Sequence, residues 1–208
     1  MSASLVGSEM CIRDRYKLKK SKGDLLMNIL KAIEMRKSVR SYTEERIEEE
    51  KLKAMIRAGN LAPVFGRFHI TVIENQDLLR EINDITLDMM KHSGNGFMEN
   101  QAAIEGYQPL YGAGVMFVLS VPGGNDEHGF QMANAACAAE NMIVEATELG
   151  LGSCFIMGPM IAFSKDEVAE KAQIPEGDVP LVGILAGYPA QPLSVNERRE
   201  PDNVTWLK

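Results

Sequence analysis

A dense group of cations and hydroxyls lies at residues 36–42, where the chain reads Arg-Lys-Ser-Val-Arg-Ser-Tyr. Guanidinium forks and an ammonium group can hold a phosphate from several sides through charge-assisted hydrogen bonds, and serine hydroxyls can add further donors. The stretch therefore has the chemistry of a phosphate cradle. A second interpretation stays open, because cations also favour the last turn of a helix and these residues follow a predicted one.

The chain as a whole is acidic, so a basic site of this kind can only be a local feature. The chain has 208 residues and a formal net charge of -7, which argues against nucleic acid or an anionic membrane as a partner. No apolar run approaches the roughly 20 residues that span a bilayer. Three widely spaced cysteines without a C-x-x-C pair argue against a disulfide framework or a zinc site and favour the reducing cytoplasm.

Familiar catalytic motifs of protein side chains are missing from the sequence. There is no G-x-S-x-G nucleophile elbow, no G-K-[ST] phosphate loop and no H-E-x-x-H metal pair. The three histidines, His69, His92 and His128, are scattered. A phosphate cradle without a protein nucleophile indicates that a bound cofactor carries the reaction, so we predict no catalytic side chain and no metal ligand.

The elements that would position the cradle alternate between amphipathic helices and short apolar strands. Periodicity predicts helices from residue 28 to the basic stretch, over a segment that ends at 59–60, and over 76–91, 130–149 and 164–173. Buried strands are predicted at 68–73, at 115–119, within 150–158 and at 179–188. Ser164 and Glu167 have the spacing of a capping box. This order gives an α/β or α+β class, with a sheet covered on both sides.

Two further segments are informative. The predicted helix at 130–149 is apolar nearly all round and rich in alanine, so it is buried either inside the domain or in a subunit interface, and we favour a dimer. The mixed stretch at 97–111 holds Tyr107 and Tyr111 among polar residues. It could form a lid over a pocket or a packed surface segment, and the sequence favours the second.

Residues 1–26 differ from the rest in composition, with six cations against three acids in an otherwise acidic chain. Residues 4–15 also resemble a translated sequencing-linker artefact. We therefore expect a non-native or disordered leader over 1–26, a natural start at Met27 and one domain over 27–208. A basic anchoring arm is the alternative interpretation.

From about residue 27 onward, the sequence resembles the FMN-dependent nitroreductase family. Residues 33–42, Ile-Glu-Met-Arg-Lys-Ser-Val-Arg-Ser-Tyr, resemble the family's R-R-S-x-R-x-[FY] signature. Residues 136–152 resemble its interface helix, and residues 182–189 resemble its last strand with a Gly-Tyr-Pro ending. The resemblance depends on the order and spacing of these motifs taken together.

The resemblance implies which residues bind FMN. The signature gives ligands of the flavin phosphate and ribityl chain, and a tail arginine that reaches the phosphate adds a fifth: Arg36, Lys37, Ser38, Arg40 and Arg199. The segment with Phe155, Met157 and Gly158 would pass its backbone over the isoalloxazine ring and aim an amide at N5.

One loop departs from the family pattern. The family often has A-P-S-x-x-N-x-Q-P-W after the second helix, whereas this chain has the shorter Ala-Pro-Val-Phe-Gly-Arg-Phe at 62–68. The asparagine and glutamine that would meet the flavin ring are absent. Only Pro63, Val64 and Phe65 carry over, as backbone or packing neighbours of the cofactor.

The resemblance also implies a fold, a partner and a reaction. The fold would be an α+β sandwich with a central, mostly antiparallel sheet flanked by helices, in an intertwined homodimer with two FMN sites. NADH or NADPH would donate hydride in a ping-pong mechanism to a small-molecule acceptor such as a nitroaromatic or a quinone. The alternatives are a related flavin enzyme of different reaction, either a reductive dehalogenase or a flavin-consuming type, and a non-catalytic flavin-binding protein.

Overall fold

A single four-stranded sheet forms the centre of the protein. The computed structural model describes residues 29–124, 129–195 and 203–207. The strands are β1 (His69–Ile73), β2 (Val115–Pro122), β3 (Gly152–Ile156) and β4 (Asp178–Gly187). Their order in the sheet is β1-β2-β4-β3, and each neighbouring pair is antiparallel.

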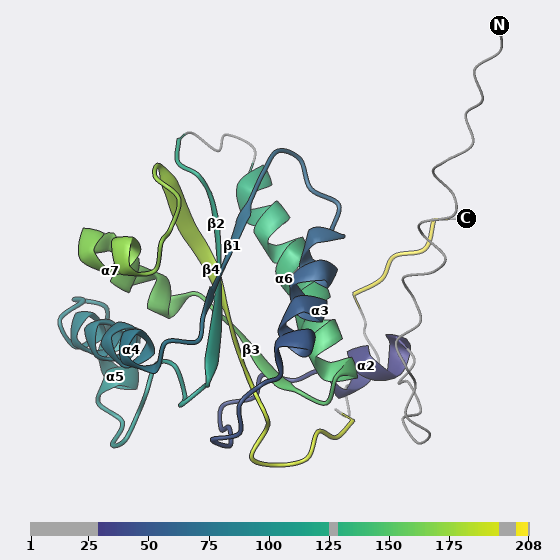
Figure 1. Ribbon diagram of the computed structural model, residues 1–208, viewed down its shortest axis with the longest axis horizontal. Helices are drawn as coiled ribbons and strands as arrows, with labels where there is room; N and C mark the ends of the chain where they lie inside the picture. The colour runs from purple at the N-terminus through teal and green to yellow at the C-terminus, as the bar shows by residue number, and fades with distance from the viewer. Residues whose placement is uncertain (1–28, 125–128, 196–202, 208) are drawn as a thin grey trace, which may run out of the picture.

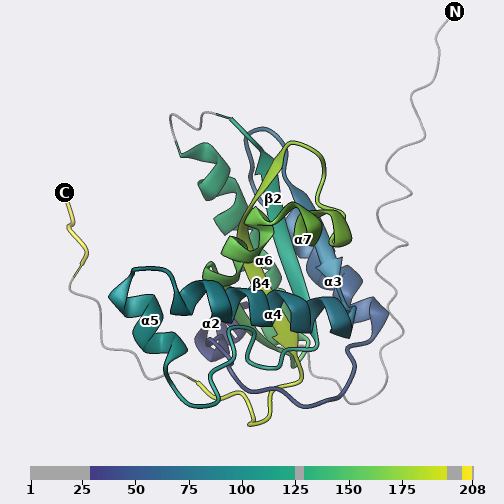
Figure 2. The ribbon, with the colours of Figure 1, turned by 90° about the vertical axis from the view of Figure 1, so that its left-hand side faces the viewer.

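Helices cover both faces of this sheet. They are α2 (Ile29–Met35), α3 (Glu49–Asn60), α4 (Gln76–Lys91), α5 (Gly96–Ala102), α6 (Phe130–Glu148) and α7 (Asp166–Lys171), with a 3₁₀-helix η2 at Gly158–Ser164. Figure 1 shows α3 and α6 on one side of the sheet and α4, α5 and α7 on the other. In Figure 2, α4 runs across the face of the strands. The predicted α+β class, with an antiparallel sheet flanked by helices, is confirmed.

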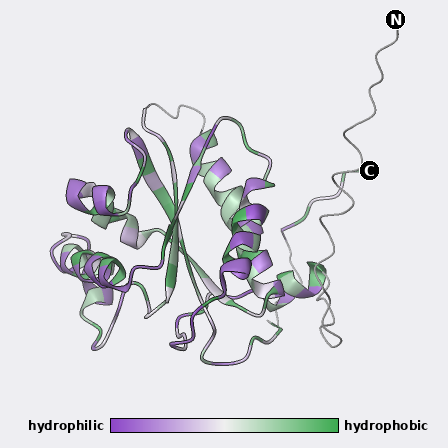
Figure 3. Cartoon of the chain, in the orientation of Figure 1, coloured by the Kyte–Doolittle hydropathy of each residue, from purple (hydrophilic) through white to green (hydrophobic). Residues whose placement is uncertain are grey.

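Two apolar cores lie on the two faces of the sheet, because successive side chains of a strand point to opposite sides. Phe117 and Leu119 of β2 pack with the α3 and α6 side, and Met116 and Val118 pack with the α4 side. Figure 3 shows hydrophobic residues along the central strands and mixed hydrophilic and hydrophobic residues on the flanking helices. Strand β2 is thus buried on both faces, as its apolar run predicts.

Helix α4 has the predicted bounds. The Asn75 side chain caps it by accepting hydrogen bonds from the backbone N–H groups of Asp77 and Leu78, at 3.0 and 3.2 Å. Such a cap satisfies donors that the first turn of a helix leaves unpaired. Leu78 and Ile82 then lie on its buried face.

The capping box predicted at Ser164 is wrong. The Ser164 hydroxyl donates a hydrogen bond back to the Ile161 oxygen at 2.7 Å, and α7 begins after Lys165 without a side-chain cap. The residues before it form η2, which the sequence analysis did not predict. Lys165, and not Ser164, therefore occupies the N-cap position, so the S-x-x-E spacing is one residue out of register with the helix.

Helices α2 and α6 leave apolar side chains outside the core. Ile29, Leu30 and Ile33 of α2 are exposed, although their spacing is helical. Helix α6 buries one face against α3 and the sheet, but Ala133 and Cys137 on its other face are exposed. The leader predicted at 1–26 lies outside the described residues. No helix among the described segments has the length and apolarity to cross a membrane.

Candidate functional site

The basic stretch that follows α2 docks on the free edge of β3. The Val39 N–H donates a hydrogen bond to the Ser153 oxygen at 2.8 Å, and Ser38 forms a parallel bridge with Ser153. The Val39 side chain is buried directly over Gly152. The stretch therefore extends the sheet edge by a short contact, which fixes the backbone from which the cations project.

The other end of the stretch is held by the chain that leaves β4. The Thr43 N–H donates to the Tyr188 oxygen at 2.9 Å, and the Ala190 N–H donates to the Ser41 oxygen at 3.0 Å. The Tyr42 ring covers Gly187, and its hydroxyl donates to the Val39 oxygen at 2.8 Å. Figure 1 shows these two segments, purple-blue and yellow-green, together below the sheet.

Charged and polar side chains of the stretch influence the buried thiol of Cys154 on β3. Burial raises the pKa of Cys154, while the Arg40 charge, the Ser38 hydroxyl and the Arg36 charge act in the opposite direction. These three side chains come from one short segment, and the Val39–Ser153 hydrogen bond holds that segment on the edge of β3. A segment of this kind has the donors and charges that a phosphate cradle requires.

Two contacts connect this cradle to other elements. Arg36 Nε lies 3.7 Å from a carboxylate oxygen of Glu140 on α6. Lys37 Nζ donates to the Ser194 hydroxyl at 3.4 Å, so the tail passes beside the cradle. Arg199, the predicted tail ligand, lies outside the described residues.

A buried hydroxyl beside the cradle supports its fit to a polar ligand. Ser153 is only 3% exposed, and its Oγ has no hydrogen-bond partner among the described residues. A buried polar group without a partner costs free energy that a bound polar group would recover. With the nearby cations, this donor set suits a phosphate-bearing cofactor such as FMN.

The residues predicted to meet the flavin ring lie in two places. Phe155 lies near the end of β3, two residues after Ser153. Met157 and Gly158 follow the strand, and both are exposed. The loop with Pro63, Val64 and Phe65 is anchored elsewhere: the Phe65 N–H donates to Asn134 Oδ1 at 2.9 Å. Asn134 lies six residues, or about 9 Å, before Glu140 along α6. The loop and the cradle therefore contact α6 at two different points.

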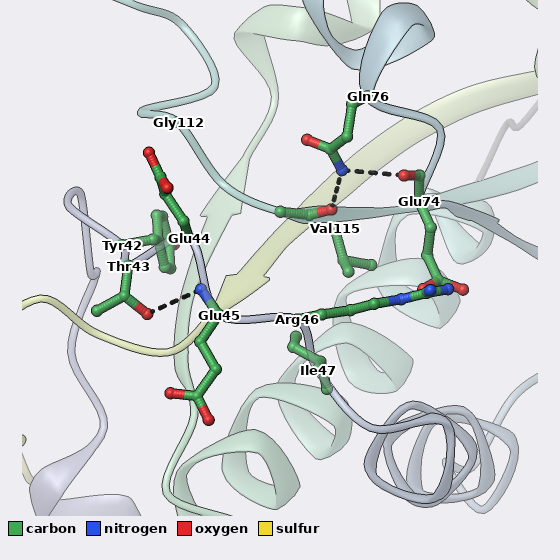
Figure 4. A pocket seen from close by; sticks show the side chains of 11 residues that line it. Tyr42, Thr43, Glu44, Glu45, Arg46, Ile47, Glu74, Gln76, Gly112 and Val115 are labelled. Carbon is green, nitrogen blue, oxygen red and sulfur yellow. Dashed lines mark hydrogen bonds and ion pairs between the residues drawn. The ribbon is translucent and has the colours of Figure 1, made fainter.

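A cavity of about 470 Å³ lies beyond Tyr42, but its charge does not suit phosphate. Figure 4 shows Glu44 and Glu45 at its wall and Arg46 extended toward Glu74, with which Arg46 forms an ion pair at 3.2 Å. Carboxylates would repel a phosphate group. Nor do the described residues contain a group of three His, Cys, Asp or Glu side chains that could hold a metal ion.

Sequence reasoning missed several residues around the cradle, above all Tyr111. The Arg40 guanidinium carbon lies 5.7 Å from the centre of the Tyr111 ring, and Tyr107 packs edge-on against Tyr111 at 6.0 Å. Burial, followed by the contact with Tyr111, raises the pKa of Tyr107 to about 12. The two tyrosines were visible in the mixed stretch at 97–111, but nothing in their spacing predicts contact with residue 40.

We expect Gly152→Ala to loosen the cradle, because the new Cβ would lie 2.8 Å from Val39 Cγ1. Overpacking of this kind costs about 1–3 kcal/mol, and relief would require Val39 to move off β3. Thermal unfolding should show a lower Tm. Gly114→Ala is the matched control, since no atom lies within 4 Å of its added Cβ. Equal, small Tm changes in both variants would contradict the proposed close contact.

Comparison with known proteins identifies similar sequences and folds. A sequence profile described as "Nitroreductase family" matches residues 33–188. The chain is 25% identical over 183 residues to "FMN reductase (NADPH)" of Bacillus subtilis, an alignment that covers 86% of this chain and 72% of that protein.

Two crystal structures have the same fold. A nitroreductase with bound FMN from Bacteroides fragilis has a TM-score of 0.77 and 25% identity, over 88% of this chain and 100% of that one. A nitroreductase with bound FMN from Desulfitobacterium hafniense has a TM-score of 0.79 and 22% identity over the same shares.

Proposed function

Since this chain belongs to the nitroreductase family, we propose that it is an FMN-dependent oxidoreductase that takes hydride from NADH or NADPH. The observation that carries the proposal is the docking on β3 of the short stretch that holds Arg36, Ser38 and Arg40, beside the buried hydroxyl of Ser153. In a chain of net charge -7, a local group of cations of this kind is suited to one anionic ligand. Membership of the family supports the phosphate of FMN as that ligand.

In this proposal, the basic stretch binds and orients the cofactor. Arg36, Lys37, Ser38 and Arg40 hold the phosphate and ribityl chain, and Arg199 approaches from the tail. The charge-assisted hydrogen bonds of these groups are the strong ones available to a protein. Bound FMN supplies the redox chemistry, accepting hydride from the nicotinamide and passing electrons to the acceptor.

The ring would lie along the segment with Phe155, Met157 and Gly158. The exposed backbone at Gly158 can approach a planar ring closely, because glycine has no side chain to block it. Its N–H is the donor that we assign to flavin N5. A fixed donor at this atom stabilises the charge that develops there during hydride transfer.

We propose that a second copy of the chain completes the site. The loop with Pro63, Val64 and Phe65 is anchored on α6, and Phe65 is 76% exposed beside Phe130. An exposed aromatic pair formed by this loop and the start of α6 suits a subunit contact. The loop of each subunit would then face the cofactor of the other.

The acceptor that we propose is a small conjugated electrophile, such as a nitroaromatic or a quinone, in a ping-pong reaction. Both half-reactions would use the same flavin face, so the donor must leave before the acceptor binds. The experiment is an anaerobic titration of the FMN-loaded protein, followed by its visible absorbance. NADH or NADPH should bleach the flavin, and an added quinone or nitroaromatic should restore the colour.

The titration can fail in two ways, and each contradicts a different part of the proposal. Flavin that neither nicotinamide reduces on the timescale of turnover would contradict the oxidoreductase proposal and favour a non-catalytic flavin-binding protein. Rapid reduction without reoxidation by either acceptor would contradict the proposed acceptor class. His69→Ala and His92→Ala serve as controls. Since we assign no side chain as an obligatory base, each should leave the rate of reduction within about tenfold, a barrier change near 1.4 kcal/mol.

A further inference from the structure

The two arginines of the cradle have different partners. Arg36 lies near the carboxylate of Glu140, whereas Arg40 forms no ion pair with any carboxylate among residues 29–124, 129–195 and 203–207. Its guanidinium carbon instead lies 5.7 Å from the centre of the Tyr111 ring. A cation over a ring is attracted by the ring quadrupole but keeps its full charge. Arg40 is therefore held in place without being neutralised.

The backbone of Tyr111 has an unusual conformation. Its φ is 52°, in the left-handed region that glycine and asparagine enter readily and an aromatic residue rarely does. A non-glycine residue held there is strained, so the surrounding structure must maintain it. Such strain commonly marks a side chain whose direction matters for function.

The turn around Tyr111 shows how this conformation is maintained. The Tyr111 N–H donates to the Gln108 oxygen at 2.9 Å, and the Ala113 N–H donates to the Leu110 oxygen at 3.0 Å. Asn83 of α4 accepts a hydrogen bond from the Leu110 N–H at 3.2 Å, and Leu110 is buried. The Asn83 hydrogen bond thus holds the turn on α4, and the Tyr107 ring packs edge-on against the Tyr111 ring.

We propose that Tyr111 is a positioning residue, which holds the Arg40 guanidinium ready to bind the phosphate of FMN. An exposed arginine loses rotamer entropy when it is fixed on a ligand. A ring that fixes it beforehand removes part of that loss from the binding step. The phosphate is the expected anion because Arg36, Lys37 and Ser38 project from the same short stretch. This inference rests on the proposed function, since it presupposes FMN binding.

The test compares Tyr111→Leu with Tyr111→Phe by titrating the apoprotein with FMN and with riboflavin. Both variants keep a side chain in the strained backbone, but only phenylalanine keeps an aromatic face. We expect Tyr111→Phe to bind FMN within about twofold of the wild type, and Tyr111→Leu to bind it about three- to tenfold more weakly. Riboflavin, which lacks the phosphate, should bind both variants alike.

Three results would overturn the inference. One is an equal loss of FMN affinity in the leucine and phenylalanine variants, which would assign the effect to the hydroxyl or to general packing. Another is an equal loss for riboflavin and FMN in Tyr111→Leu, which would place Tyr111 against the flavin ring. The last is a full effect of Tyr111→Leu in an Arg40→Gln background, because a residue that acts through Arg40 cannot matter once Arg40 is gone.

The wild-type titration separates this inference from the proposed function. If the wild-type apoprotein binds no FMN, the proposed function fails, and the positioning role of Tyr111 fails with it. If the wild type binds FMN and the two tyrosine variants bind it equally well, only the positioning role of Tyr111 is wrong.

Discussion

Arg36→Glu should lower the affinity of the apoprotein for FMN by more than tenfold. The substitution removes charge-assisted hydrogen bonds worth about 1.5–3 kcal/mol each and places a carboxylate where a phosphate must bind. Arg36 and Arg40 both influence the Cys154 thiol electrostatically, so a reversed charge at residue 36 would also offset part of the positive potential that Arg40 provides. Isothermal titration with FMN at fixed ionic strength measures the effect.

Glu140→Gln is the matched control for this substitution, because Arg36 also contacts Glu140 at 3.7 Å. If Arg36→Glu acted by breaking that ion pair, removing the charge of Glu140 would weaken FMN binding as well. If Arg36 binds the phosphate, Glu140→Gln removes a competing carboxylate and should leave the affinity unchanged or higher. A large loss in both variants would contradict a direct role for Arg36 at the phosphate.

Ala133→Glu should dissociate the proposed dimer. Phe130, Ala133 and Cys137 form an exposed stripe at helical spacing on α6, and Phe65 lies beside Phe130. If this stripe meets a second copy, the new carboxylate is buried without a partner, at a cost of about 3–5 kcal/mol. Sedimentation should then show the monomer and a loss of bound flavin, since we propose that both subunits build each site.

Ala103→Glu provides the control, because it adds the same charge to an exposed alanine at the end of α5 on the other side of the sheet. It should sediment like the wild type. Ala139, on the same apolar helix, is fully buried inside the subunit, so a charge there would destabilise the fold instead. A wild type that sediments as a flavin-loaded monomer at micromolar concentration would end the dimer proposal.

Elements defined by local chemistry could be predicted from the sequence, whereas those decided by packing could not. Helix α4 has a complete apolar period and an asparagine before its first turn, so its bounds follow from the sequence alone. The stretch around η2 has neither signal. Its apolar residues fit a 3₁₀ turn, and the Ser164 hydroxyl takes part in that turn rather than in the following helix.

The candidate site divides in the same way. The cations at 36–42 are adjacent in sequence, and the structure docks the backbone of this stretch on the edge of β3. Their assignment to FMN, like that of Arg199, stays a prediction. Tyr111 lies 71 residues from Arg40 and reaches it only because a turn fastened to α4 holds a left-handed backbone. No periodicity or spacing encodes such a contact between distant segments.

The docking of Val39 on Ser153 also affects how readily the protein aggregates. Strand β3 is an edge strand, and an uncovered edge offers backbone groups to which a strand of another molecule can pair. Residues 38 and 39 occupy part of that edge with a backbone hydrogen bond of 2.8 Å. The segment that we assign to cofactor binding therefore also blocks part of this edge from pairing with a strand of another molecule. Loss of this backbone contact would expose the edge of β3 and favour aggregation.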